Sequence, residues 1–180
     1  MEHLELKVKS LTLKSYVLLS PDDQLKILSW RNHASVRNLF LQQAEISETE
    51  HFDFIESLKS DSTKRYWMVS RNEIQIGSLD LYRITERDCF WGYFLAPHIQ
   101  KSSLGLLLEF AVMEIVFDRM GLTALKCETL AHNENALKIH RQFGYRETGQ
   151  KEGRVYMEMD AATWKEKKQM LEEFIELLLR

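Results

Sequence analysis

The chain has 180 residues, of which 44% are hydrophobic and 28% are charged, and its net charge is −3 at neutral pH. This length and composition predict a single globular domain, and the scatter of lysines and arginines along the chain argues against a nucleic-acid partner or a basic membrane-binding segment. The first ten residues mix acids and bases and lack the apolar run of a signal peptide, so we expect a cytoplasmic protein without a membrane partner.

The N-terminal third predicts one strand followed by two helices. Apolar residues alternate with polar ones between 4 and 19, which is typical of a half-buried strand. Ser20-Pro21 then begins a helix that we expect to end near 31–33. Ser47 and Glu50 have the spacing of a capping box, which predicts a second helix through about Lys59.

The middle of the chain has the pattern of an antiparallel meander and a long helix. Segments 65–70, 74–84 and 88–96 are rich in β-branched and aromatic residues, and polar turns separate them. Beyond a loop at 97–102, apolar residues recur at helical spacing from Leu104 to Ile115. This spacing predicts an amphipathic helix, and Gly121 is placed to end it.

The remaining segments are predicted as a strand at 122–130, a helix at 133–143, strands at 144–149 and 154–160, and a C-terminal helix. The fold class that follows is α/β (α+β), with a central mixed, mostly antiparallel sheet flanked by helices in a domain of residues 1–160. The amphipathic helix at 161–180 is expected to pack on this domain or on a partner subunit, and the second case gives a homodimer.

The cysteines and histidines predict neither a disulfide nor a metal site. Cys89 and Cys127 are too few for a disulfide framework, and neither has a histidine partner in its sequence context. The six histidines lack metal-ligand spacing. We therefore expect buried, reduced thiols and no metal cofactor.

The loop before the long helix has the features of an anion site. Gln100, Ser103 and Gly105 lie between a strand and a helix, where backbone N–H groups and the helix dipole favour a negative group. Gly105 has no side chain to hinder a ligand that approaches the backbone. The alternative is an ordinary strand-to-helix turn with a serine cap.

A second motif follows the next strand. Q-x-x-S-x-G at 100–105 and N-x-x-A-L-x-I-H-x-x-F-G-Y at 133–145 together resemble the acetyl-CoA motifs of the GNAT superfamily of N-acetyltransferases. The predicted order of elements also resembles the GNAT fold. The resemblance implies acetyl-CoA as co-substrate, with the loop amides on its pyrophosphate, Asn133 on the pantetheine arm and residue 140 beside the leaving thiol. The implied cofactor residues are Leu95, Gln100, Lys101, Ser102, Ser103, Leu104, Gly105, Asn133, Ala136 and His140.

Two residues depart from the family pattern. Ser103 stands where the family usually has glycine, which a tight loop tolerates if φ stays negative. His140 stands where the family usually has the tyrosine that protonates the departing CoA thiolate. A histidine, with a reference pKa of roughly 6.5 against about 10 for tyrosine, makes a charged general acid accessible near neutrality. The alternative is a core histidine, since His140 shares an apolar stripe with Ile139 and Phe143.

The N-terminal half has a more specific resemblance. L-S-W-R-N-H at 28–33, I-S-x-x-x-H-x-x-F-I at 46–55, Y-W-x-V at 66–69 and I-G at 76–77 resemble the nucleotide-sugar N-acetyltransferases of pseudaminic acid biosynthesis. With the cofactor motifs, the resemblance covers about 25–150. These enzymes acetylate the 4-amino group of UDP-4-amino-4,6-dideoxy-N-acetyl-β-L-altrosamine. The resemblance therefore implies a UDP-linked amino sugar as the acceptor.

Several residues are candidates for the acceptor site. The planar fork of Arg31 suits a diphosphate, and the alternative is an ion pair at a helix end. By the resemblance, His51 faces the nucleotide sugar, and the alternative is a histidine on a helix surface. Aromatic residues that could stack on a uracil ring or a sugar, and that are otherwise core residues, are Phe40, Phe52, Trp91 and Tyr93.

The expected reaction is direct attack of a neutral amine on the thioester, without a covalent enzyme intermediate. Glu128 removes the amine proton through water if desolvation raises its pKa, and otherwise it is a carboxylate on the sheet surface. A strand N–H near Leu95 polarises the carbonyl group, and His140 protonates the thiolate. The alternatives are an N-terminal acetyltransferase of the ribosomal-protein type and a non-catalytic GNAT module that binds acetyl-CoA, which Ser103 and His140 suggest.

Overall fold

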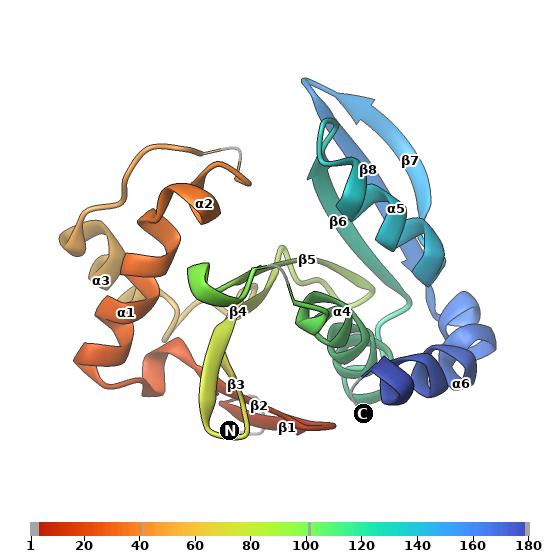
Figure 1. Cartoon of the computed structure of the whole chain (residues 1–180), viewed down its shortest axis with the longest axis horizontal. Coiled ribbons are helices and arrows are strands. Elements are labelled where there is room, and N and C mark those ends of the chain that lie inside the picture. Colours follow the sequence, from red (N-terminus) through yellow and green to blue (C-terminus); the bar gives the residue numbers. More distant parts are fainter. Residues whose placement is uncertain (1–3, 41, 101, 179–180) are drawn as a thin grey trace. The chain divides into compact units, whose positions relative to one another are not determined.

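The computed structural model describes residues 4–40, 42–100 and 102–178 (Figure 1). The strands are β1 (Glu5–Val8), β2 (Leu11–Ser15), β3 (Arg65–Arg71), β4 (Ile74–Tyr82), β5 (Asp88–Leu95), β6 (Ala124–Leu130), β7 (Arg146–Lys151) and β8 (Arg154–Asp160). The α-helices are α1 (Pro21–Asn32), α2 (Ala34–Arg37), α3 (Glu48–Ser57), α4 (Leu104–Met113), α5 (Glu134–Phe143) and α6 (Ala161–Leu178). Short 3-10 turns lie at Tyr16–Leu18 and Pro97–Ile99, and Glu114–Arg119 forms a π-helical turn.

The strands are hydrogen-bonded in the order β1-β2-β3-β4-β5-β6-β8-β7. The β5–β6 pair is parallel, and the pairs β1–β2, β2–β3, β3–β4, β6–β8 and β7–β8 are antiparallel. The predicted mixed, mostly antiparallel sheet with flanking helices is therefore confirmed. The chain divides into two compact units, which share β5: unit 1 comprises residues 1–83 and 92–102, and unit 2 comprises residues 84–91 and 103–180.

Unit 1 begins with a hairpin where the sequence predicts a single strand. Leu6, Val8, Leu11 and Leu13 are all buried, but β1 ends at Val8 and β2 begins at Leu11. Lys9 between them has a φ of 53°, a left-handed conformation that turns the chain back. The spacing of three between Val8 and Leu11 breaks the strict alternation of a single strand and is the signature of this turn.

The helices of unit 1 begin where the sequence predicts them. Ser20 caps α1 by accepting a hydrogen bond from the Asp23 N–H at 3.2 Å. At α3, Ser47 and Glu50 form both hydrogen bonds of the predicted capping box. The four-residue helix α2 was not predicted, and it follows His33, whose ring accepts a hydrogen bond from the Ser35 N–H. Figure 1 shows α1, α2 and α3 close together, and their apolar faces cover a core that includes Ile27, Val36 and Ile55.

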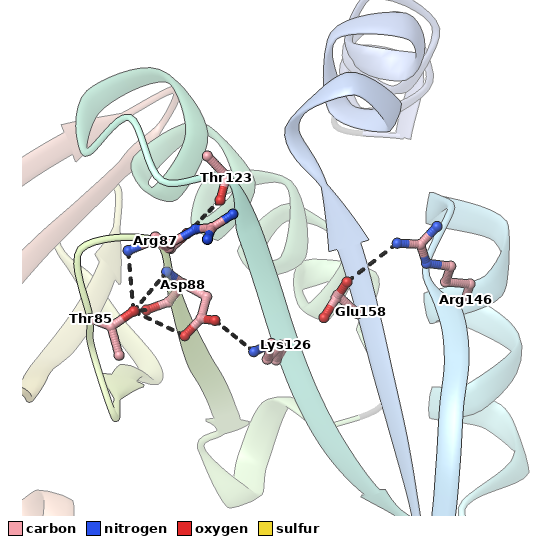
Figure 2. A network of polar contacts seen from close by, with 7 residues as sticks. All are labelled: Thr85, Arg87, Asp88, Thr123, Lys126, Arg146 and Glu158. Carbon is pink, nitrogen blue, oxygen red and sulfur yellow. Dashed lines mark hydrogen bonds and ion pairs between the residues drawn. The ribbon is translucent and has the colours of Figure 1, made fainter.

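In unit 2, polar contacts link the start of β5 to the start of β6 (Figure 2). The Lys126 ammonium lies 2.7 Å from an Asp88 carboxylate oxygen, and the Thr123 hydroxyl donates to the Arg87 carbonyl. The Thr85 hydroxyl oxygen accepts from the Asp88 N–H at 3.0 Å, which closes the predicted turn before β5. These contacts stabilise the start of the parallel pair.

Helix α4 differs from the amphipathic helix that the sequence predicts. All residues from Leu107 to Met113 are buried, so the helix has no solvent face in this stretch. Helix α6 covers one side, where the Trp164 ring lies 5.4 Å from the Phe110 ring and its indole N–H donates to Asp118. The predicted helix is confirmed, but its amphipathic character is not, because the apolar spacing marks one buried face while the burial of Glu109 depends on contacts distant in sequence.

No helix in the described part of the chain is long and apolar enough to cross a membrane.

Candidate active site

The start of α4 contains the last residues of the predicted anion loop. Ser103 is the N-cap residue, has a φ of −73° and makes no side-chain cap hydrogen bond. The negative φ explains why this position accepts serine in place of glycine. N–H groups in the first turn of a helix have no partner within the helix, and the dipole is positive there. The N-cap Ser103 and the first-turn residue Gly105 therefore suit a pyrophosphate group.

The rest of the predicted loop belongs to unit 1. The Gln100 side chain donates to the Ser35 carbonyl oxygen at 3.0 Å, which ties the loop to α2. Leu95 is buried at the end of β5. Just before it, the carbonyl oxygen of Phe94 lies so close to Gly77 that a Cβ there would be 2.1 Å from it, which requires glycine. Ser102 is described, whereas Lys101 lies outside the described residues.

Asn133 forms the N-cap of α5 in unit 2. Its side-chain oxygen accepts a hydrogen bond from the Ala136 N–H at 3.3 Å. The cap uses Oδ1, so Nδ2 is the group that can meet a ligand. The predicted cofactor residues Asn133 and Ala136 are thus joined by one hydrogen bond at the start of the helix that carries His140.

His140 forms a contact that the sequence did not predict. Its Nδ1 lies 2.7 Å from Oε1 of Glu109 in α4, and the side chains of His140 and Glu109 are 6% and 0% exposed. The other Glu109 oxygen, Oε2, has no hydrogen-bond partner among the described residues. One buried carboxylate therefore depends on this imidazole for its stabilisation.

The electrostatics of the pair favour a charged imidazole. Burial lowers the pKa of His140, but the Glu109 charge and hydrogen bonds with Cys127 and Glu109 outweigh it and raise the pKa to about 10. Burial raises the pKa of Glu109, and His140 opposes that rise. Because the two groups share one proton across 2.7 Å, we place it on the imidazole, which makes the pair ionic.

Two aromatic rings and a thiol surround His140 in unit 2. The Trp91 ring meets the imidazole edge to face with 5.7 Å between centroids, and the Tyr145 ring lies 5.4 Å away. Trp91 is 3% exposed, so this predicted stacking residue occupies the core next to the predicted acid. Cys89 and Cys127 are free, buried thiols, as expected. Cys127 is hydrogen-bonded to His140, a partner distant in sequence that its sequence context did not indicate.

Unit 1 brings two predicted acceptor residues together. The Arg31 guanidinium carbon lies 3.8 Å from the centre of the Phe40 ring, and Nη2 donates to the Gln42 carbonyl oxygen at 3.0 Å. Nη1 is buried and has no hydrogen-bond partner among the described residues. Burial lowers the pKa of Arg31, while the charges of Tyr16 and Asp80 oppose this. No direct ion pair of Arg31 is seen among the described residues, but the Asp80 charge acts on this guanidinium, so the alternative of an ion pair at the helix end stays open.

Other predicted acceptor residues lie elsewhere in unit 1. His51 is 5% exposed, and its Nε2 bonds to the Gln24 carbonyl oxygen at 2.9 Å. It is therefore not on a helix surface, and its Nε2 already has a backbone partner. Phe52 packs next to His51 with 6.0 Å between ring centroids. Tyr93 is half-buried on β5.

The carboxylates differ in what they contact. Glu128, the predicted base, accepts a hydrogen bond from Arg154 at 3.1 Å in unit 2. Asp80, which the sequence analysis missed, lies in unit 1, where burial raises its pKa to about 7 and Arg31 opposes the rise. A Cβ at Gly92 would lie 3.2 Å from Oδ2 of Asp80, so glycine leaves room beside this carboxylate. Among the described residues, no group of histidine, cysteine and acidic side chains could hold a metal ion.

Comparisons with known proteins identify the family of this chain. Residues 16–146 match the model of the acetyltransferase (GNAT) domain. The chain is 30% identical to the acetyltransferase PseH of Campylobacter jejuni over 130 residues, which cover 72% of this chain and 81% of PseH. The crystal structure of C. jejuni N-acetyltransferase PseH with acetyl coenzyme A superposes with a TM-score of 0.70 at 23% identity, covering 83% of this chain and 98% of that one.

A second solved structure shows the same fold. The Vibrio cholerae spermidine N-acetyltransferase, solved with CoA and spermine, has a TM-score of 0.78 at 18% identity, and the match covers 88% of this chain and 99% of that chain. From the domain match over most of its length and from its curated relatives, the chain belongs to the GNAT acetyltransferase family.

Proposed function

We propose that this GNAT enzyme transfers the acetyl group of acetyl-CoA to an amino group on a nucleotide-linked sugar. The specific acceptor is the 4-amino group of UDP-4-amino-4,6-dideoxy-N-acetyl-β-L-altrosamine, the substrate class that the N-terminal motifs imply. Two findings support this proposal: the identity to C. jejuni PseH, and a fold match to FdhC, described as a nucleotide-linked sugar GNAT, with a TM-score of 0.75 at 20% identity.

Arg31 carries the acceptor assignment. Its guanidinium rests on the Phe40 ring, which fixes the plane of the fork, and one arm of the fork is bound to Gln42. The other arm, Nη1, is a buried donor without a partner among the described residues, and a buried donor of this kind calls for a partner such as water, an ion or a ligand. A diphosphate oxygen would satisfy Nη1 and compensate a buried positive charge.

The residues of the site have distinct roles in the proposed reaction. When bound, acetyl-CoA supplies an activated acetyl group, and the start of α4 and the Asn133 amide hold its pyrophosphate and pantetheine parts. His140 donates a proton to the leaving sulfur. A base with a pKa near the working pH removes the amine proton most effectively. Asp80, with a pKa of about 7, has this basicity, whereas the Glu128 carboxylate is already bound to Arg154.

The test is an acetylation assay with three acceptors: the UDP-linked 4-amino sugar, spermidine and an N-terminal peptide. We expect turnover with the sugar nucleotide alone. Arg31→Lys keeps the charge but loses the fork, so KM for the sugar nucleotide should rise roughly 10- to 150-fold, from about 1.5–3 kcal/mol for a charged hydrogen bond.

The matched control is Arg65→Lys, because Arg65 also donates to backbone carbonyl groups in unit 1. Its KM should equal that of the wild type. Preferred turnover of spermidine or peptide would refute the acceptor assignment, and so would an Arg31→Lys enzyme with an unchanged KM for the sugar nucleotide.

A further inference from the structure

The Glu109–His140 contact joins two helices of unit 2 through one short hydrogen bond. The residues are 31 positions apart, and Nδ1 of His140 lies 2.7 Å from Oε1 of Glu109. The end of α5 is fixed as well, because the His140 carbonyl oxygen accepts from the N–H groups of Gly144 and Tyr145. Both the ring and the backbone of His140 are therefore held in place.

Burying the Glu109 carboxylate in an apolar helix costs free energy, and packing alone does not explain why a charged residue stands there. Removing a carboxylate from water costs several kcal/mol, and an apolar side chain at position 109 would avoid this cost. In return, Glu109 fixes which ring nitrogen is engaged. Since Nδ1 contacts the carboxylate, Nε2 is the ring nitrogen that remains to act on a ligand, in a ring that also bonds to the Cys127 thiol.

We propose that Glu109 is a positioning residue for the acid His140: it binds Nδ1, keeps the imidazole protonated, and presents Nε2–H to the sulfur that leaves the acetyl group. This inference rests on the proposed function. In the reaction, the amine lone pair forms the C–N bond as the C–S bond breaks. The Nε2 proton passes to the sulfur, and the amine proton passes to the base and on to solvent. Solvent then reprotonates Nε2.

The acid strength of the pair fits the position that His140 occupies. The resemblance implies a tyrosine there, whose reference pKa is about 10. The pKa of His140 is raised to about 10, so the pair gives an acid of the same strength. Trp91, Cys127 and Tyr145 also face the ring, and none of them is a carboxylate. Glu109 therefore supplies the negative charge.

The decisive experiment is the pH profile of kcat for the Glu109→Gln variant. Glutamine keeps the shape but not the charge, so the His140 pKa should fall to about 6.5 or below, leaving about 3% of the acid protonated at pH 8. We expect kcat at pH 8 to fall at least 30-fold and to recover as the pH falls toward 6. The control is Glu114→Gln, which breaks the ion pair with Arg119 just beyond α4 and should keep the wild-type profile.

A double variant separates charge from packing. Glu109→Met with His140→Tyr replaces the pair by an acid that needs no counter-charge and an unbranched apolar chain. It should regain a wild-type profile, and a folded but inactive double variant would contradict an acid role at position 140. If Glu109→Gln alone does not fold, this double variant still tests the acid role at position 140.

NMR titration of the His140 ring gives a readout independent of turnover. The wild-type ring should remain charged above pH 8, and a ring that is neutral at pH 7 would overturn the inference. An active wild type with an unchanged kcat profile in Glu109→Gln would also overturn it. A wild type that acetylates no amine refutes the proposed function instead.

Discussion

The His140→Phe substitution tests how strongly the buried pair contributes to stability. Phenylalanine fills the space of the imidazole but leaves Glu109 fully buried, with neither oxygen bonded among the described residues. Removing one partner of a buried ion pair typically costs about 3–5 kcal/mol. For a chain of this size, about 1 kcal/mol shifts Tm by roughly 2–4 °C, so we expect Tm to fall by roughly 6–20 °C.

The double variant His140→Phe with Glu109→Met should regain most of this loss, because replacing a buried pair by apolar residues is often neutral. The penalty also depends on pH. The folded pKa of Glu109 is raised by burial above its unfolded value of about 4.3, and losing His140 raises it further. The carboxyl group is thus tolerated below about pH 4, and its penalty grows as the pH rises from the unfolded pKa to the folded pKa, above which it is constant.

The assay is urea denaturation followed by circular dichroism at pH 4.5 and 7.5. The difference in unfolding free energy between wild type and His140→Phe should be larger at pH 7.5. Equal stabilities at pH 7.5, or a penalty that grows toward acid, would show that the pair is not ionic in the folded protein.

Three further substitutions follow from the packing. Trp164→Ala should lower the free energy of unfolding in denaturant by about 3–5 kcal/mol, because the ring is 2% exposed and packs on Phe110. A loss below about 1 kcal/mol would mean that α6 is not anchored there. Asp80→Asn should stabilise the protein at pH 8 and have no effect near pH 4. The reason is that the folded pKa of Asp80, about 7, lies above the unfolded value of about 3.9, and the carboxylate costs stability between these two pKa values. Equal effects at both pH values would contradict this. Gly144→Ala should lower Tm, since φ is 111° and a Cβ would lie 2.8 Å from Lys167; an unchanged Tm would contradict this strain.

Local signals were sufficient for most of the fold. Ser20 and Ser47 predicted the starts of α1 and α3, because a cap is made within a few residues of chain. The hairpin at Lys9 was missed although its signal was present, in the uneven spacing from Val8 to Leu11. A long segment of alternating apolar and polar residues can be one strand or two, and only a break in the alternation tells them apart.

The site was less predictable because its chemistry depends on contacts between distant residues. Glu109 stands in an apolar helix, where a charged residue is usually exposed, and its partner lies 31 residues further along. Asp80 follows the alternation of β4 and shows nothing unusual until the fold places it next to Gly92. In both cases the sequence gives the residue type, whereas burial and partner come from the tertiary structure.

The pairing of Glu109 with His140 also restricts how this protein can evolve. A lineage that gains the histidine first has a neutral, weaker acid, and one that gains the glutamate first carries an uncompensated charge in its core. Each single step is unfavourable, so the two substitutions are epistatic. Positions 109 and 140 should therefore change together among related sequences, with an acidic residue at 109 wherever histidine replaces tyrosine at 140.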